Sequence, residues 1–331
     1  MSDYNQKIVE DYWSRADASA SDRNFYCYPV IRSHSCKLIF GEADASRRDW
    51  CQYWTVEKYL KEIIPVKKCL SICCGFGEIE RMLARLGVAD HILGMDVAPG
   101  AIEKARERAL AEGLGNIEYQ VADLNAEELP VEEYDIIWAN GALHHIRELD
   151  GVVAKLFRAL KPGGYLVSNE YVGPDYQQLP RRQQEIVNAV KHLLPMELRS
   201  ADDGRRPSLL SKIARRLRRK SFRLREQDEA IYARLWKMPT IDHFKATDPS
   251  ECVRSSQIIP TLHNHFDSVT VRYFDGSILF YALDPVFYAN FDGHKPTHRR
   301  LLELLFELER FYIDSGEMQS DNAHIICRKN P

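Results

Sequence analysis

The segment 68-KCLSICCGFGEIERMLARL-86 decides the fold class of this chain of 331 residues. Its first six residues form a short apolar run that stops ahead of Gly75 and Gly77, which predicts a buried strand entering a tight turn. After the turn, one helical face carries four apolar residues: Ile79, Met82, Leu83 and Leu86. Because glycine has no Cβ, this turn allows a ligand to approach the backbone closely.

Strands and helices keep alternating after this segment. Apolar patterns predict strands over 91–95, 117–121, 134–139 and 165–171, and helices over 101–112 and 149–160. The run Lys161-Pro162-Gly163-Gly164 is a strong stop signal for the last of these helices. The alternation predicts an α/β fold, a Rossmann-like doubly wound and mostly parallel sheet, with a helical insertion after the fifth strand. Ligands of such sheets bind beyond the carboxyl ends of the strands.

The chain divides into four segments by composition and pattern. Residues 1–66 form an aromatic-rich extension, interpreted as a lid, as packing on the core or as an oligomer interface, and residues 67–173 form the ligand-binding core. Residues 174–265 are mainly helical and look like an insertion that shapes an acceptor pocket. Residues 266–331 hold strand patterns at 268–274 and 323–328 and an amphipathic helix at 297–314, which complete the core.

Composition narrows the class of protein. A formal net charge of −3 gives no global argument for nucleic-acid binding. The sequence has no run of 18 apolar residues and no apolar signal-peptide region near its start, so we expect a cytoplasmic protein without a transmembrane segment. The eight cysteines include no CxxC pair, which favours reduced thiols over a zinc or disulfide framework.

Acidic residues follow two of the predicted strands. Asp96 lies at the tip of the second strand, where a carboxylate can accept both hydroxyl protons of a ribose. Asp123 follows the third strand and can accept from an adenine amino group. The third glycine of a dinucleotide fingerprint is replaced by Glu80, and Glu78 lies in the same turn, where acids repel a pyrophosphate. The pattern therefore favours a ligand with a ribose and a base but no pyrophosphate.

Five motifs together resemble the class I S-adenosylmethionine-dependent methyltransferases, in their small-molecule branch, over about residues 67–172. The motifs are Leu70–Gly77 (LSICCGFG), Gly94-Met95-Asp96, Ala122-Asp123-Leu124, Tyr134–His145 (YDIIWANGALHH) and Leu160–Tyr165 (LKPGGY). The resemblance implies S-adenosylmethionine as the cofactor. More faintly, 169–174, 248–255 and 301–315 resemble methyltransferases that accompany glycosyltransferases in bacterial surface-polysaccharide pathways.

The same resemblance implies roles for particular residues. The loop with Ser71, Cys73, Gly75, Phe76 and Gly77 would face the methionine part of the cofactor. Asp96 with Val97 would bind the ribose, Asp123 and Leu124 would flank the adenine, and Asn140 and Gly141 would line the pocket where the methyl group leaves. Two positions depart from the family pattern, which usually has an acid at Ser71 and a glycine at Cys73. A side chain at Cys73 is unfavourable if its φ angle is positive.

Methyl transfer to a hydroxyl benefits from a base, and three residues near the strand ends are candidates. His145 lies just past the fourth strand with His144 beside it, and Glu170 lies near the end of the fifth. The alternatives are a structural role at a helix start for one histidine and a solvated strand-end carboxylate for Glu170. Tyr171 is a candidate for lining the acceptor site, and Arg254 with Ser255 for fixing an anionic acceptor, although a surface ion pair also explains Arg254.

Two further clusters in the sequence are a histidine pair and a basic stretch. Alternation would place His263 and His265 on one strand face like a metal pair, but no carboxylate partner is obvious, and we predict no metal site. Residues 205–225 carry ten Lys and Arg and no acid, and they predict a basic amphipathic helix. This helix could touch an anionic membrane surface, a lipid-linked or nucleotide-linked substrate, or RNA, or it could be the solvated face of a lid.

The sequence thus predicts a methyltransferase of a small-molecule acceptor, most simply a hydroxyl of a sugar, glycan or related metabolite. One alternative is RNA methylation with the helix at 205–225. Nucleic acid is disfavoured by the negative net charge and by Asn140-Gly141-Ala142-Leu143 standing where an amino-methylating Asn/Asp-Pro-Pro-Tyr motif would be. The other alternative is a catalytically silent methyltransferase fold that acts as a binding partner, motivated by Ser71 and Cys73.

Overall fold

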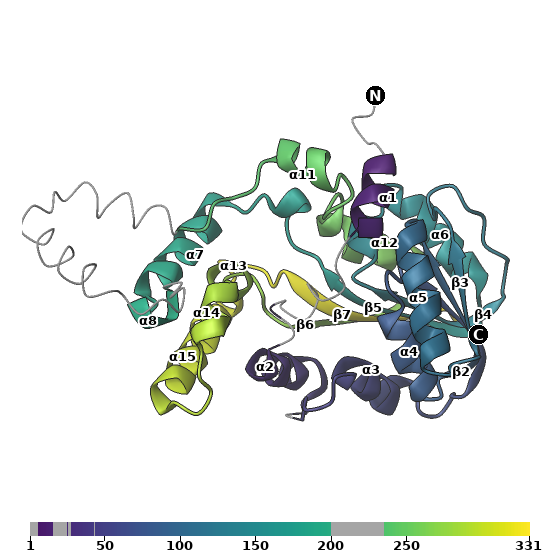
Figure 1. Ribbon diagram of the computed structural model, residues 1–331, viewed down its shortest axis with the longest axis horizontal. Helices are drawn as coiled ribbons and strands as arrows, with labels where there is room; N and C mark the ends of the chain where they lie inside the picture. The colour runs from purple at the N-terminus through teal and green to yellow at the C-terminus, as the bar shows by residue number, and fades with distance from the viewer. Residues whose placement is uncertain (1–5, 16–24, 26–27, 43, 200–234) are drawn as a thin grey trace, which may run out of the picture. The chain divides into compact units, whose positions relative to one another are not determined.

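The computed structural model describes residues 6–15, 25, 28–42, 44–199 and 235–331 (Figure 1). Its strands are β1 (Val66–Ile72), β2 (Ala89–Asp96), β3 (Ile117–Val121), β4 (Tyr134–Asn140), β5 (Leu160–Tyr171), β6 (Ser268–Tyr273) and β7 (Asn322–Arg328). Its α-helices are α1 (Gln6–Arg15), α2 (Pro29–Phe40), α3 (Trp50–Thr55), α4 (Glu78–Arg85), α5 (Pro99–Ala111), α6 (Leu149–Ala159), α7 (Arg181–Leu193), α8 (Met196–Arg199), α11 (Ile241–Thr247), α12 (Ile258–His265), α13 (Leu279–Ala282), α14 (Pro285–Asn290) and α15 (Pro296–Asp314). Shorter turns of helix are η3 (Val56–Leu60), η4 (Leu143–His145), η5 (Asp175–Gln177) and η6 (Ser255–Gln257).

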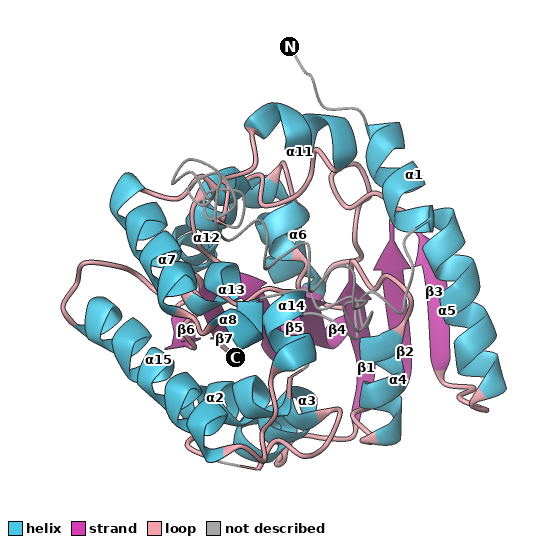
Figure 2. Ribbon diagram, turned by 60° about the vertical axis from the view of Figure 1, so that its left-hand side comes forward, coloured by secondary structure: helices cyan, strands magenta, loops and turns pink. Residues whose placement is uncertain are grey.

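Within the described residues, seven strands form one sheet in the order β3-β2-β1-β4-β5-β7-β6. The pairs β1–β2, β2–β3, β1–β4 and β4–β5 are parallel, whereas β7 runs antiparallel to both β5 and β6. Figure 2 shows these strands in magenta. The predicted α/β fold with a mostly parallel, doubly wound sheet is confirmed.

Alternation along the strands explains how the two faces of the sheet are covered. Leu70 and Ile72 pack with α6 and α12 in one core cluster, whereas Cys69 packs with α4 and η3 in another. Side chains point to opposite faces with a period of two, so a single strand serves both cores. The predicted strand and helix at 68–86 are observed as β1 and α4.

The sheet register brings the carboxyl ends of the central strands to one level. Ile72, the last residue of β1, pairs with Met95 of β2 and Ala139 of β4. Cys73, which follows β1, therefore lies at the same edge of the sheet as Asp96 and Asn140, the last residues of β2 and β4.

Two compact units divide the chain. The first comprises residues 1–178, 239–277 and 310–331 and contains the sheet, and the second comprises 179–238 and 278–309. Part of the predicted insertion 174–265, from 239 onwards, belongs to the first unit. The excursion that leaves the first unit at Gln178 returns at Pro239, and the Gln178 side-chain amide donates a hydrogen bond of 2.8 Å to the carbonyl of Pro239.

Two predictions from the sequence need correction or fall outside the described residues. His263 and His265 lie on α12, not on a strand, so their side chains do not share one face and the metal-pair pattern is lost. The basic stretch 205–225 lies outside the described residues. Among the helices that the structure describes, none has the length and apolar character needed to span a bilayer.

Candidate active site

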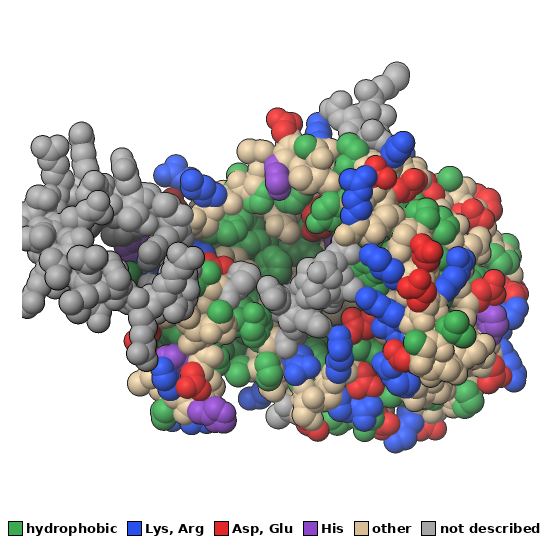
Figure 3. Space-filling view, viewed as in Figure 1, with side chains coloured by type: hydrophobic (Ala, Val, Ile, Leu, Met, Phe, Trp, Pro, Cys, Tyr) green, Lys and Arg blue, Asp and Glu red, His purple; other side chains and the backbone are tan. Residues whose placement is uncertain are grey.

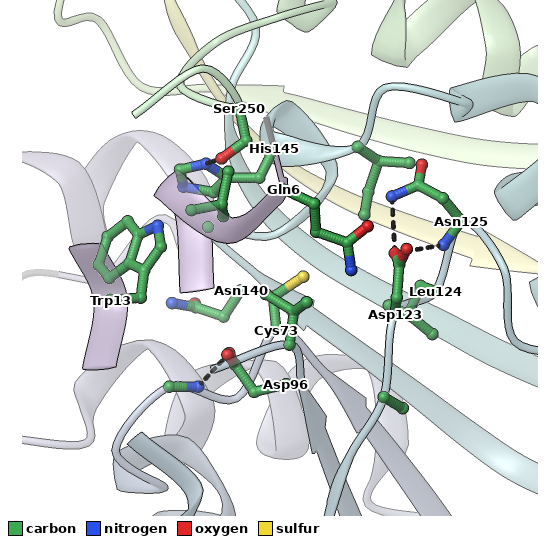
Figure 4. A pocket seen from close by; sticks show the side chains of 16 residues that line it. Gln6, Trp13, Cys73, Asp96, Asp123, Leu124, Asn125, Asn140, His145 and Ser250 are labelled. Carbon is green, nitrogen blue, oxygen red and sulfur yellow. Dashed lines mark hydrogen bonds between the residues drawn. The ribbon is translucent and has the colours of Figure 1, made fainter. Parts of the chain in front are cut away.

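A cavity of about 250 Å³ opens at the carboxyl ends of the central strands (Figure 4). Eight of the predicted cofactor residues line it: Cys73, Gly75, Asp96, Val97, Asp123, Leu124, Asn140 and Gly141. His145 lines it as well. The sheet register thus brings together residues that are far apart in the sequence.

Helix α1 contributes a wall of this cavity that the sequence did not reveal in detail. Gln6, Val9 and Trp13 line the cavity, and their spacing places them on one face of the helix. The sequence predicted a lid somewhere in 1–66, but the polar residues around Val9 hid which face is used. Ser250 and Asn125 were also missed as lining residues.

Asp96 is held in place by the backbone. Its Oδ2 accepts a hydrogen bond of 2.9 Å from the Gly75 N–H and its Oδ1 one of 2.9 Å from the Ala98 N–H. Burial raises the pKa of Asp96, and the backbone donors work against that rise. Asp123, the other acidic residue that lines the cavity, accepts two hydrogen bonds of 2.9 Å at Oδ1 from the backbone and side chain of Asn125 (Figure 4).

The turn after β1 adopts left-handed backbone angles at three positions. The φ angles are +49° at Cys73, +50° at Gly75 and +72° at Gly77. Nothing lies within 4 Å of where a Cβ of Gly75 would be, so this glycine leaves open space at the cavity. The expected unfavourable conformation of Cys73 is observed, and burial raises the pKa of its thiol.

Gly77 is absent from the lining of this cavity and of the one beside it, and its contact with the cofactor stays a prediction. A Cβ on Gly77 would come 2.3 Å from the hydroxyl of Tyr119 and 2.8 Å from the Cβ of Ala105. Its role is to let α5 and β3 pack closely against the turn.

A second cavity of about 620 Å³ shares Cys73 and Asn140 with the first. Ser71 and Phe76 line this second cavity and not the first. Ser71 donates a short hydrogen bond to Oε1 of the fully buried Glu80, while Oε2 of Glu80 has no hydrogen-bond partner among the described residues. Burial raises the pKa of Glu80 to about 7.

On the visible face over α4 and α5, acidic and basic side chains are interspersed (Figure 3).

His145 belongs to a hydrogen-bonded network that links three segments. Its Nδ1 lies 3.0 Å from the hydroxyl of Ser250, and that hydroxyl donates a hydrogen bond of 2.5 Å to Oδ1 of Asp248. The indole N–H of Trp13 donates to Oδ2 of the same carboxylate at 2.9 Å. The Trp13 and His145 rings also meet edge to face, with their centroids 5.4 Å apart. The network fixes both α1 and His145 to the loop at 248–253.

Glu170 is buried beneath His144 and does not line the cavity. It accepts hydrogen bonds from the backbone N–H of Ala142 and Leu143, at 2.8 and 2.9 Å, and its Oε2 lies 2.7 Å from Nδ1 of His144. These contacts position η4 from beneath, so Glu170 supports the backbone before His144 and does not face the cavity.

The two neighbouring histidines have opposite electrostatics. Burial disfavours the charged form of His144. The hydrogen bond and the charge of Glu170 outweigh burial and raise the pKa of His144. Burial, followed by the charge of His144, lowers the pKa of His145. The environment therefore separates the proton affinities of two adjacent imidazoles.

The predicted acceptor residues lie apart from the first cavity. The Tyr171 hydroxyl donates to the carbonyl of Pro174 at 3.2 Å, and the Ser255 hydroxyl to that of Cys252 at 3.2 Å. Arg254 forms an ion pair with Asp150 at 2.7 Å and donates to Gln257, the alternative weighed from the sequence. None of these three residues lines the cavity.

Comparison with known proteins adds an independent observation. Residues 69–164, from β1 to the start of β5, match a family model described as a methyltransferase domain. These residues form a class I methyltransferase domain, the S-adenosylmethionine-dependent class.

The names of proteins similar to this domain refer to several areas of small-molecule metabolism. The chain is similar to sterol 24-C-methyltransferase ERG6A of Gibberella zeae, with 34% identity over 125 residues that cover 35% of this chain and 32% of that protein. It is similar to phosphoethanolamine N-methyltransferase 1 of Arabidopsis thaliana, with 31% identity over 32% of this chain and 21% of that protein. It also resembles the ubiquinone/menaquinone biosynthesis C-methyltransferase UbiE of Vibrio vulnificus, with 30% identity over 40% of this chain and 50% of that protein. The chain matches at most half the length of each of these three relatives.

Proposed function

We propose that the chain is an S-adenosylmethionine-dependent methyltransferase of a small-molecule acceptor. The observation that carries the proposal is the cavity beside Asp96 at the carboxyl ends of β1, β2 and β4, within the matched methyltransferase domain. The three relatives support the small-molecule part, because their names refer to sterols, phosphoethanolamine and quinone biosynthesis.

The lining of the cavity fits this cofactor chemically. Each carboxylate oxygen of Asp96 accepts one backbone hydrogen bond, which leaves acceptor capacity for the two hydroxyls of a ribose. Among the described residues that line the cavity there are two carboxylates and no Lys or Arg. That charge balance suits a sulfonium cation and disfavours a pyrophosphate.

The residues of the chain would divide the work as follows. When bound, S-adenosylmethionine supplies an electrophilic methyl group, and the protein supplies alignment. Asp96 holds the ribose, Asp123 and Leu124 flank the adenine, and Asn140 and Gly141 border the reacting end. Helix α1 covers the cavity with Gln6, Val9 and Trp13 and keeps water away. His145 is the residue proposed to face the acceptor; that it takes a proton stays a prediction.

For the acceptor we propose a hydroxyl of a sugar, glycan or related metabolite. The support is the resemblance of 169–174, 248–255 and 301–315 to methyltransferases of polysaccharide pathways, together with the place of His145 at the cavity. The acceptor lid at 174–265 and a cytoplasmic or membrane-surface location remain predictions. A screen of sugar nucleotides, glycan lipids and RNA separates this proposal from RNA methylation, whose binding should weaken steeply as salt rises. Turnover of any acceptor would exclude a silent binding protein.

The cofactor site is tested by titration calorimetry with S-adenosylhomocysteine. We expect Asp96→Asn to weaken binding about a hundredfold, because two charge-assisted hydrogen bonds to the ribose lose their anionic partner. The matched control is Asp90→Asn on the same strand, an exposed residue paired with Lys67, which should bind like the parent protein. Equal affinity of the two variants would show that the cofactor lies elsewhere.

A further inference from the structure

Three side chains at the edge of the cavity converge on one point. His144, His145 and Glu251 each offer one ligand atom, and these atoms all lie within 4.8 Å of one another. The distance from Nε2 of His145 to Oε2 of Glu251 is 3.9 Å. Donor atoms around a bound zinc ion are roughly 3.3 Å apart, since each metal–ligand bond is about 2.0 Å, so small side-chain rotations would close this set on an ion.

Hydrogen bonds fix which ring nitrogen each histidine keeps available. Nδ1 of His144 contacts the carboxylate of Glu170, which as an anion can only accept. The hydroxyl hydrogen of Ser250 goes to Asp248, so Ser250 can only accept at the contact with Nδ1 of His145. Both neutral rings therefore carry their proton on Nδ1 and keep the Nε2 lone pair. Metal-binding histidines are oriented by such outer contacts.

Glu251 is held just as firmly. The Cys252 thiol donates a hydrogen bond of 3.0 Å to its Oε1, which leaves Oε2 on the side of His145. Cys252 has a φ of +51°, an unfavourable angle for a side-chain-bearing residue, and the Val253 N–H donates to the carbonyl of His144 at 3.1 Å. The loop backbone is thus anchored on His144, and the strained residue Cys252 follows directly after the carboxylate that lies beside His145.

We propose that His144, His145 and Glu251 form a binding site for a divalent transition-metal ion at the edge of the cofactor cavity. Two imidazoles and one carboxylate suit Zn²⁺, Co²⁺ or Fe²⁺, whereas Mg²⁺ prefers oxygen ligands alone. The carboxylates of Glu251, Glu170 and Asp248 lie around the two histidines and supply negative charge that favours a dication. This proposal departs from the sequence analysis, which predicted no metal site.

Three protein ligands leave coordination positions free on the cavity side, where His145 is part of the lining. An ion there would bind the acceptor hydroxyl and lower its pKa, so that the oxygen reaches the methyl group as an alkoxide while its proton passes to solvent. His145 then acts as a ligand and not as a base. This catalytic part rests on the proposed function, whereas metal binding itself does not.

The test is a Zn²⁺ competition titration of the full chain against a chromophoric chelator. We expect one ion per chain, about a hundredfold weaker binding in Glu251→Gln and about tenfold weaker binding in Ser250→Ala, which removes only the contact that orients His145. His263→Gln on α12 is the matched control and should bind Zn²⁺ like the parent protein. Thermal unfolding of each variant checks that the fold is intact.

Besides a failure of the parent protein to bind Zn²⁺, two results would overturn the site. One is parent-like Zn²⁺ affinity in both Glu251→Gln and Ser250→Ala. The other is a thiolate charge-transfer band on adding Co²⁺, which would place the ion on cysteines. A parallel titration with S-adenosylhomocysteine separates the two proposals: cofactor binding without Zn²⁺ binding rejects only the metal site. Zn²⁺ binding without cofactor binding rejects only the proposed function.

Discussion

Cys73 places a thiol at the junction of the two cavities while its backbone lies in the left-handed region. A Cβ in that region costs about 1–2 kcal/mol, which glycine avoids. The neighbouring turn residues Gly75 and Gly77 have similar φ angles, so Cys73 is the turn position that retains this strain.

Replacing Cys73 by glycine and by alanine separates strain from volume. Both changes remove the sulfur, but only Cys73→Gly removes the Cβ. We expect Cys73→Ala to have a free energy of unfolding about 1 kcal/mol lower than Cys73→Gly, measured by urea denaturation. We also expect Cys73→Gly to bind S-adenosylhomocysteine at least as tightly as the parent protein. An alanine variant as stable as the glycine variant would contradict the strain assignment.

At this scale the sequence predicted residue positions better than residue contacts. Asp96, Asp123 and Asn140 were found because each lies at or just past the end of a strand, and strand ends meet at one edge of a parallel sheet. Ser250 and Glu251 were missed as partners of His145 because more than a hundred residues separate them from it, and no local period reports such a contact. Glu170 was found, but its burial beneath η4 depends on hydrogen bonds that a pattern does not encode.

Among the elements, α1 has the most direct connection to the cavity. One of its faces lines the cavity. Trp13 on that helix donates a hydrogen bond to Asp248, in the loop whose Ser250 contacts His145. A ligand that fills the cavity would add contacts to that face and leave the opposite face exposed.

We expect S-adenosylhomocysteine to slow amide hydrogen exchange in α1, because a filled cavity stabilises the docked helix against local opening. The measurement is exchange mass spectrometry at saturating ligand. Helix α7 of the second unit is the internal control and should exchange at an unchanged rate. Unchanged exchange in α1 at saturation would show that the helix does not cover the ligand.

Elements with a strong period were predicted well, and those without one were not. The core strands and helices were found within a few residues, whereas β5 begins at Leu160 and not at 165 as predicted. The Pro-Gly-Gly run ended the helix as expected, but Leu160 also pairs with Tyr134 across a register shift. The strand face considered for His263 and His265 is wrong, because three residues of alternation are too few to distinguish a strand from the end of a helix such as α12.

For the whole molecule, the buried His324 on β7 connects folding to pH. Burial lowers its pKa to about 3 from 6.5, and its ring lies between Thr55, Cys51 and Phe40. Above pH 6.5 the ring is neutral in both the folded and the unfolded chain. Below pH 6.5 the unfolded chain takes up a proton that the folded chain refuses, so stability falls as pH falls toward 3.

We expect His324→Gln to remove this dependence. Below pH 6.5, each pH unit of acidification should lower the free energy of unfolding of the parent protein by about 1.4 kcal/mol relative to that of the variant. The raised pKa of Glu80 gives an opposite slope from pH 4.5 to 7, but it is common to both proteins and cancels in the difference. Denaturant titrations at several pH values measure this, with the exposed His263→Gln as control. Parallel pH profiles of the parent protein and His324→Gln would contradict it.

The hydrogen bond between Gln178 and Pro239 has a consequence for how such a chain diversifies. The sixty residues between them leave and rejoin the first unit at one point. A hydrogen bond within the first unit therefore holds the two ends of this stretch together, whatever its sequence. A change in the length of that stretch costs little loop-closure entropy at the stem, and the packing it must preserve is that of α7 and α8 against α13 and α14 within the second unit. Changes in the length of the stretch between Gln178 and Pro239 are therefore expected to leave Asp96 and His145, which belong to the first unit, in place.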